Sequence, residues 1–214
     1  MSIDKLVAAK WRTFVITQRP APRNHSYAKA VFLLITALFV IQAAEEPELR
    51  VKSLFESQKF RTATEFLRSD HARFVQELIT LTEIPAPPFK EHARAKAYLE
   101  MLSVNGLSDV EMDAEGNVMG LRKGSGGSPM LAVLAHLDTV FPEGIDVKVK
   151  QTGTKLAAPG VGDDSRGLSV VLHILRAMKA AKFQTVSDIL FVGDVGEEGE
   201  GDLRGVKYLL TKGK

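Results

Sequence analysis

Two uninterrupted apolar runs enclose an amphipathic helix in the second half of the chain. The runs cover residues 130–134 and 189–192, and between them apolar positions from Leu168 to Met178 recur at three- and four-residue spacing. A short run that is apolar at every position is typical of a strand buried on both faces. Strand, helix and strand in this order predict an α/β fold with a mostly parallel sheet flanked by helices. The polar stripe of the helix, which carries His173 and Arg176, is expected to face solvent.

Upstream of the first run, the sequence predicts smaller elements that complete this domain. Ser69 and Asp70 can cap a helix that Pro85 ends, and a second helix follows Pro87 and Pro88. Two short strands are expected at residues 110–112 and 117–121, and a small hairpin at 147–149 and 155–156. We therefore expect residues 69–214 to form one domain and residues 45–68 to be a linker that runs into its first helix.

Acidic and imidazole side chains follow both apolar runs and also precede the helix. Because ligands bind beyond the carboxyl ends of strands in an open parallel sheet, these side chains are expected at one edge. The motifs are His136-Leu137-Asp138 after the first run, Asp163-Asp164 in the glycine-rich loop 159–167, and Glu197-Glu198 after the second run.

The side chains of these motifs suit a hydrolytic site with two metal ions. Asp138 can accept the second imidazole N–H of His136, which leaves the other nitrogen to face a metal. Asp163 can offer one oxygen to each of two cations. Of Glu197 and Glu198, one can bind metal while the other accepts a proton from water.

Each motif also has a purely structural interpretation. An isolated His-x-Asp pair is common, Asp163-Asp164 could only cap the helix, and Glu197-Glu198 could be a solvated turn. Their order and their positions at the ends of apolar runs favour a metal site. The remaining histidines, His25, His71, His92 and His173, are interpreted as surface residues.

Composition narrows the chemistry further. The chain contains no cysteine, so thiolate catalysis, disulfide bonds and cysteine-based zinc sites are excluded. Six basic residues and one acidic residue give residues 1–44 a net charge of +5, which leaves −3 on the rest of a chain whose total is +2. A mildly acidic body argues against nucleic acid as a partner.

The N-terminal region has the features of a targeting sequence. Basic residues precede the uncharged apolar block 30–41, and small residues and Glu45-Glu46 follow it. This order is typical of a secretory signal peptide, and the block is short for a membrane span. We expect residues 1–44 to direct export to the periplasm or the outside of the cell, or to remain as a membrane anchor. A buried helix of the domain is the alternative.

The three motifs together resemble those of the di-zinc metallopeptidase family of peptidase T, carboxypeptidase G, aminoacylase and succinyl-diaminopimelate desuccinylase. The resemblance covers about residues 70–212 and rests on His-x-Asp, an aspartate in a glycine-flanked loop, and Glu-Glu, in that order. It implies that His136 binds one zinc ion, Asp163 bridges two, and Glu198 binds the other. It also implies that Asp138 orients His136, that Glu197 is the general base, and that the peptide bond after Asp163 is cis.

The resemblance further implies hydrolysis of peptide bonds by a zinc-activated water, with N-acyl amino acid deacylation as the alternative. Cobalt or manganese are alternatives to zinc, because histidine and carboxylates suit several divalent ions. The substrate would be a peptide or an N-acyl amino acid, and a homodimer of the full-length protein is compatible with the family.

Two features depart from the family pattern. Ser165-Arg166 stands where the family often has lysine and glycine, and the chain ends at Lys214 before a further acidic ligand, a histidine ligand and a lid domain. We therefore expect an N-terminal fragment of a longer enzyme. A catalytically incompetent fragment, or a binding module without catalysis, is the alternative.

Overall fold

A four-stranded sheet carries the chain's candidate site at one edge. The computed structural model describes residues 46–213, so the predicted signal peptide or anchor in residues 1–44 lies outside the described residues. The strands lie in the order β1-β2-β6-β3. Their bounds are β1 (Ser108–Met112), β2 (Val118–Arg122), β3 (Gly127–His136) and β6 (Ser187–Asp194).

The sheet is mixed, and the prediction of a mostly parallel sheet is wrong. Only β3 and β6 pair in parallel, whereas β1 pairs with β2 and β2 with β6 in antiparallel fashion. The reason is local: a short turn joins β1 to β2, and such a turn forces an antiparallel hairpin. The strand–helix–strand pattern predicted the parallel pair correctly, but it carried no information on how this hairpin attaches.

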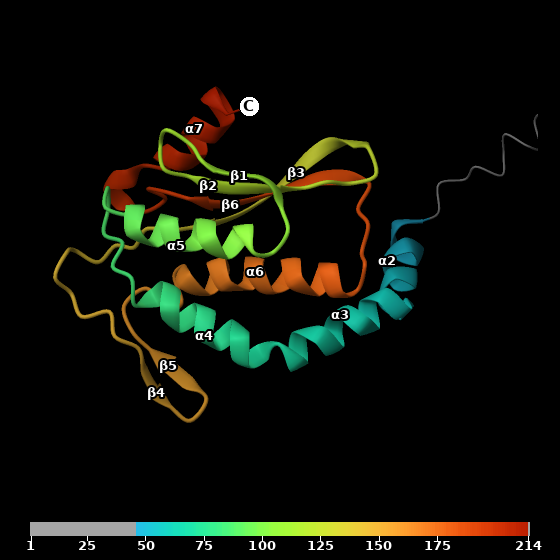
Figure 1. Ribbon diagram of the computed structural model, residues 1–214, viewed down its shortest axis with the longest axis horizontal. Helices are drawn as coiled ribbons and strands as arrows, with labels where there is room; N and C mark the ends of the chain where they lie inside the picture. Colours follow the sequence, from blue (N-terminus) through green and yellow to red (C-terminus); the bar gives the residue numbers. More distant parts are fainter. Residues whose placement is uncertain (1–45, 214) are drawn as a thin grey trace, which may run out of the picture. The chain divides into compact units, whose positions relative to one another are not determined.

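Helices lie on both faces of the sheet (Figure 1). In Figure 1, α5 and α6 cover one face, α3 and α4 pack against the outer side of α6, and α7 lies on the opposite face. The stretch expected to be a linker running into a helix contains α2 and α3. The helices are α2 (Pro47–Glu56), α3 (Gln58–Ser69), α4 (His71–Thr82), α5 (His92–Ser103), α6 (Ser165–Ala180) and α7 (Arg204–Lys212).

The hydrophobic core fills the space between the sheet and the helices α5 and α6. Leu168, Leu172 and Leu175 lie on one face of α6 at helical spacing and are buried with Tyr98 and Phe191. Burying a side chain of this size contributes about 1.5–3 kcal/mol, so this layer fixes α6 and its N-terminal loop against the sheet.

β3 differs from the buried strand that its apolar run predicts. Among the described residues it is an edge strand, paired with β6 alone, and Met130, Leu131, Val133 and Leu134 are between 37% and 52% exposed. In contrast, β6 lies inside the sheet and is buried at Phe191. The prediction of burial on both faces therefore holds for the second run and is wrong for the first.

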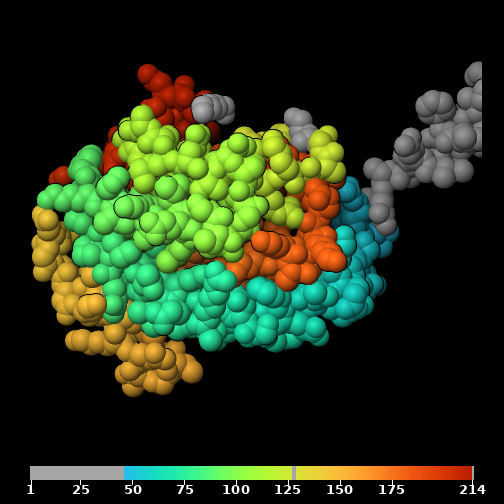
Figure 2. Space-filling view, viewed as in Figure 1, coloured from blue at the N-terminus to red at the C-terminus, as the bar shows by residue number. Residues whose placement is uncertain are grey.

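The polar stripe of α6 is also buried. Ser169, His173 and Arg176 are all buried, so the interpretation of His173 as a surface histidine is wrong. His173 stacks on Phe74 of α4, and Arg176 pairs with Asp70 and Glu77. Figure 2 shows the α6 segment (orange) reaching the surface in a narrow strip between green and teal segments.

The remaining secondary structure lies before the glycine-rich loop. β4 (Lys150–Thr152) and β5 (Lys155–Ala157) form the predicted hairpin, with the first strand three residues later than expected. Of the helices that the structure describes, none is long and apolar enough to cross a membrane.

Candidate metal centre

The parallel pairing of β3 and β6 brings two of the three motifs together. His136, the last residue of β3, lies opposite Asp194, the last residue of β6. The N–H of Leu137 donates to the carbonyl oxygen of Asp194 at 2.7 Å, which continues the pairing beyond the strands. The segments that carry Asp138 and Glu197 therefore leave the sheet side by side.

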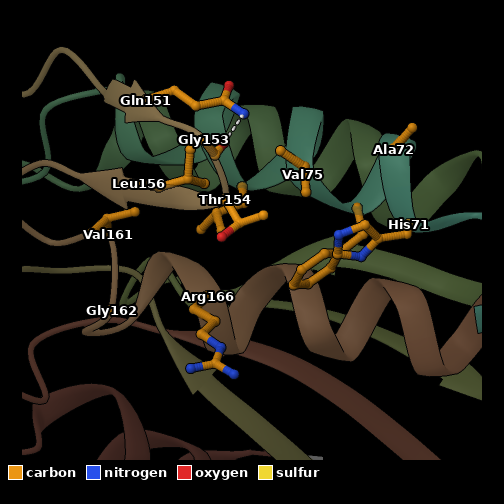
Figure 3. Close-up of a pocket in the computed structure, with 12 residues that line it drawn as sticks. His71, Ala72, Val75, Gln151, Gly153, Thr154, Leu156, Val161, Gly162 and Arg166 are labelled. Carbon is orange, nitrogen blue, oxygen red and sulfur yellow. Dashed lines mark hydrogen bonds between the residues drawn. The ribbon is translucent and has the colours of Figure 1, made fainter. Parts of the chain in front are cut away.

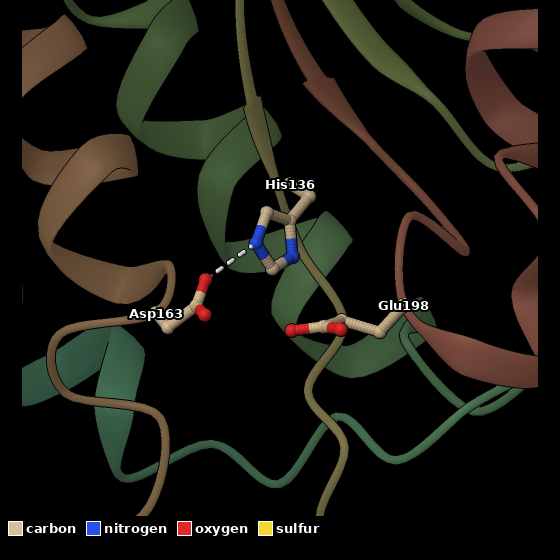
Figure 4. Close-up of side chains that lie close together, drawn as sticks. All are labelled: His136, Asp163 and Glu198. Atoms are coloured by element: carbon tan, nitrogen blue, oxygen red, sulfur yellow. Dashed lines mark hydrogen bonds and ion pairs between the residues drawn. The ribbon is translucent and has the colours of Figure 1, made fainter.

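The three predicted metal ligands converge beyond the carboxyl ends of β3 and β6 (Figure 4). His136, Asp163 and Glu198 each offer one ligand atom, and these atoms all lie within 4.8 Å of one another. Nε2 of His136 is 2.8 Å from Oδ1 of Asp163, and the carboxylate of Glu198 points toward both. Residues separated by 62 positions in sequence thus share one small volume.

Asp138 holds the glutamate loop in place. Its Oδ1 accepts the N–H of Glu197 at 3.0 Å and its Oδ2 accepts the N–H of Glu198 at 2.9 Å. Nδ1 of His136 lies 3.1 Å from the backbone oxygen of Asp138 and 3.6 Å from its Oδ1. The buried Asp138 therefore contacts both His136 and the two glutamates, and its backbone oxygen makes the closer contact with the imidazole.

Asp163 and Asp164 have different partners. Asp164 caps α6, since its Oδ1 accepts the N–H of Gly167 at 2.8 Å, and its Oδ2 accepts the N–H of His136 at 3.2 Å. A Cβ on Gly167 would lie 2.0 Å from this carboxylate, so the cap requires glycine there. The bond between the two aspartates is cis, as the resemblance implies. The capping interpretation of the pair thus applies to Asp164, while Asp163 faces His136.

The charges of the site shift the pKa values of its members. Burial by itself lowers the pKa of His136, but the surrounding carboxylates of Asp138, Asp163 and Asp164 raise it to about 10. Burial raises the pKa of Glu198, and the negative charges of Asp163 and Glu197 raise it further. Burial also raises the pKa of Asp194 to about 6. Without a metal, the imidazole therefore holds a proton that a metal would displace.

The donor set fits a divalent cation. It combines one imidazole nitrogen with carboxylate oxygens and no sulfur, which suits zinc, cobalt and manganese. Among the residues that the structure describes, no lysine or arginine forms an ion pair with Asp163, Glu197 or Glu198. The protonated imidazole of His136 therefore offsets only part of the negative charge at this site, and no lysine or arginine offsets the rest.

The sequence analysis did not single out Arg94, which binds the backbone between His136 and Asp138. Arg94 is fully buried on α5 and donates to the backbone oxygen of Leu137 at 2.8 Å and to that of Ile84 at 2.7 Å. Burial lowers its pKa to about 10, and the charge of Asp138 opposes this shift. The available signal was an arginine on the same helical face as Tyr98, which contributes to the core.

A cavity of about 580 Å³ lies behind the glycine-rich loop (Figure 3). Its walls come from α4, the β4–β5 hairpin and the first turn of α6, and it includes His71, Val161 and Gly162. In Figure 3 the guanidinium of Arg166 points away from the hairpin. His71 lines this cavity, His92 is exposed on α5, and His25 lies outside the described residues.

Comparison of the chain with known families gives a clear match over the part that carries all three motifs. Residues 132–214 match Peptidase family M20/M25/M40. Carboxypeptidase G2 from Pseudomonas sp. (strain RS-16) is 34% identical over 84 residues, which are 38% of this chain and 20% of that protein. The resemblance predicted from the motifs is therefore confirmed for this region, and the chain spans about a fifth of the length of this relative.

Solved structures show the same fold at low sequence identity. The di-peptidase Dug1p from Saccharomyces cerevisiae has a TM-score of 0.58 at 18% identity, over 69% of this chain and 37% of that chain. Human carnosine dipeptidase 1 has a TM-score of 0.59 at 14% identity, over 73% and 38%. Aminopeptidase PepT from Bacillus cereus has a TM-score of 0.52 at 23% identity, over 60% and 37%. At these identities the likeness concerns the fold alone.

Proposed function

We propose that this chain supplies the metal-binding part of an exported, metal-dependent hydrolase of amide bonds, with peptides as its substrates. The observation that carries the proposal is the convergence of the His136, Asp163 and Glu198 ligand atoms within 4.8 Å of one another. The family match over residues 132–214 and the identity to carboxypeptidase G2 support it. N-acyl amino acids, which present the same amide bond, are the alternative substrates.

In this proposal His136, Asp163 and Glu198 would hold the metal, and Asp163 would offer a carboxylate oxygen to each of two zinc ions. The metal, when bound, polarises an amide carbonyl and lowers the pKa of water, which makes hydrolysis accessible at neutral pH. Cobalt or manganese would serve the same purpose. Metal analysis of the purified protein tests this part, with up to two zinc ions per chain expected and at least one fewer in a His136→Ala variant.

The remaining residues position groups and move a proton. Asp138 fixes the loop of Glu197 and Glu198 through two N–H bonds of 3.0 and 2.9 Å. Asp164 holds the backbone of His136 and the start of α6. The exposed Glu197 is the general base that accepts the proton of the attacking water, and it later returns that proton to the leaving amine.

The decisive experiment replaces Glu197 in the protein expressed from its complete gene. Glu197→Gln keeps the size of the side chain but removes its basicity, so turnover of peptides should fall about 10²–10⁴-fold. The zinc content should stay the same. Glu100→Gln, on the exposed side of α5, is the matched control and should leave turnover unchanged. Unchanged turnover in Glu197→Gln would refute the base, and zinc binding without any turnover would favour a non-catalytic metal-binding module.

Export rests on the sequence of residues 1–44. Their basic residues, apolar block and small residues support either a cleaved signal peptide or a retained anchor. Cell fractionation together with N-terminal sequencing of the mature protein separates the two. Recovery of the uncleaved chain from the cytoplasm would contradict both.

A further inference from the structure

A second cavity, of about 440 Å³, opens beside the candidate metal centre. Glu198 lines it, so the cavity begins at one of the predicted metal ligands. Its other walls come from two loops, one with Pro87, Pro88 and Phe89 and one with Val140 and Pro142. A group bound to the metal would therefore have a mostly apolar cavity next to it.

Phe89 stands out among the residues that line this cavity. Its side chain is 60% exposed, although apolar rings are normally buried. Its backbone has a φ of 63°, in the left-handed region that bulky residues rarely adopt. Strained residues of this kind cluster at functional sites, because only the surrounding structure can hold them there.

An ion pair between the buried Glu91 and the partly buried Arg204 holds Phe89 in this conformation. The N–H of Phe89 donates to Oε1 of Glu91 at 3.1 Å, and the same oxygen accepts Nη2 of Arg204 at 2.8 Å. The guanidinium of Arg204 lies 5.2 Å from the centre of the Phe89 ring, within the range of a cation–π contact. Arg204 also pairs with Glu115 at 2.8 Å and packs over Gly196, next to the Glu197-Glu198 motif. The ring is thus tied to the loop that carries Glu198.

The charges around the cavity favour an uncharged occupant. Of the residues that line it, Lys90 is the only cationic one, and it forms an ion pair with Glu143. Glu200 adds negative charge to the rim, whereas a bound metal would compensate the charge of Glu198. An acidic side chain would meet Glu200 without a free lysine or arginine among the lining residues, whereas an apolar side chain would gain contact with Phe89 and Val140.

We propose that Phe89 is a specificity-determining residue whose ring packs against an apolar or aromatic side chain next to the scissile amide. The proposal rests on the proposed function, because it takes the group held at the metal to be the substrate amide. The preorganised ring loses little conformational freedom on binding, so its contacts with the substrate contribute to affinity.

Binding of dipeptides with a reduced, non-hydrolysable amide tests this inference apart from turnover. The ligands are Phe-Gly, Gly-Phe and Gly-Gly analogues, titrated by calorimetry into the zinc-loaded protein from its complete gene. One of the two phenylalanine ligands should bind about tenfold more tightly than the Gly-Gly analogue, as expected for a good aromatic contact. In Phe89→Gly this preference should fall to about twofold or less.

The choice of variants separates the contact from the fold. Glycine adopts a φ of 63° without strain, so Phe89→Gly removes the ring and should not lower the unfolding temperature. Phe89→Tyr should keep the preference, and Leu210→Ala, an exposed apolar change on α7, should leave it unchanged.

The outcomes distinguish this inference from the proposed function. Equal affinities for all three ligands, or a preference that persists in Phe89→Gly, would overturn the inference even if peptides are hydrolysed. A preference that depends on Phe89 in a protein without hydrolytic activity would support the inference while the proposed function fails.

Discussion

In residues 46–213, two groups of side chains combine a histidine with carboxylates, and only one of these groups contains an arginine. In the candidate metal cluster, His136, Asp163 and Glu198 meet at the edge of the sheet without a lysine or arginine partner. The Arg176 network lies on the far side of α6 and consists of Asp70, Glu77, His173 and Arg176, all buried or nearly so.

The arginine decides what each group does. Nε of Arg176 donates to Asp70 at 2.7 Å and its Nη1 donates to Glu77 at 2.8 Å, which fixes α4 to α6. Arg73 also pairs with Glu77 at 2.9 Å, so each carboxylate has a cationic partner. Asp70 starts α4 but makes no side-chain cap, because Arg176 engages its carboxylate. The carboxylates that pair with an arginine hold two helices together. The carboxylates without a lysine or arginine partner can bind a metal cation from solution.

Arg176→Met is expected to have the largest effect on stability. It leaves Asp70 and Glu77 buried without their main cationic partner, which should lower the free energy of unfolding by about 3–5 kcal/mol. Zinc affinity should not change, because the network is separate from the metal cluster. Urea denaturation and zinc titration measure the two quantities.

A compensating variant sharpens this test. Combining Arg176→Met with Asp70→Asn and Glu77→Gln removes the uncompensated charge and should recover most of the lost stability. A single variant as stable as the wild type would mean that the network does not hold α4 to α6.

Zinc binding to the candidate metal cluster should have the next largest effect on the free energy of unfolding. At a free zinc concentration of 100 times Kd, ligand binding adds about 2.7 kcal/mol to the free energy of unfolding. Asp163→Asn should weaken zinc binding at least about 100-fold and abolish this gain. Because the Asp163 side chain is 77% exposed, loss of its pair with His136 should change the stability of the zinc-free protein by no more than about 1 kcal/mol.

Thermal unfolding with and without zinc, for the wild type and Asp163→Asn, makes this comparison directly. Glu100→Gln again provides a control of similar chemistry and should respond to zinc as the wild type does. Equal stabilisation of Asp163→Asn and wild type would show that zinc binds elsewhere.

The smallest expected effect is the contribution of His173 to the pH dependence of stability. Burial lowers the pKa of His173 below its ordinary value of 6.5, and the charge of Arg176 adds to this shift while Asp70 opposes it. The unfolded chain therefore takes up a proton more readily than the folded protein, and stability falls as the pH drops below about 6.5. His173→Phe keeps the ring stacked on Phe74, 5.1 Å away, and removes the titrating nitrogen.

The free energy of unfolding of His173→Phe should accordingly fall less between pH 7.5 and pH 5.5 than that of the wild type. Denaturation curves at a series of pH values supply the slopes. Parallel slopes for the two proteins would contradict the role given to His173.

The sequence predicted the elements well where local pattern decides them. The two apolar runs, the helix between them and the β1–β2 turn all form near their expected positions. The site could also be predicted from the sequence, because His136, Asp163 and Glu198 each follow or precede an apolar element. The carboxyl ends of parallel strands meet at the same end of the sheet.

The failures have a common physical cause. Residues 130–134 and 189–192 are equally apolar, yet one run lies at the edge of the described sheet and the other inside it. His173 and Arg176 look like a solvated stripe in sequence, yet α3 and α4 cover them. An apolar or polar pattern reports the chemistry of a face and does not report which distant element will pack against that face.

The sequence by itself therefore determined the local structure and the types of donor atom at the site, since both depend on neighbouring residues. The tertiary structure alone decided which carboxylates are matched by an arginine, which strand is central, and that an exposed phenylalanine stands beside Glu198. These outcomes depend on contacts between residues far apart in the chain, such as Asp70 with Arg176 and Glu91 with Arg204. The free energy of such contacts comes from burial and charge pairing in the folded protein, and short-range sequence patterns do not encode it.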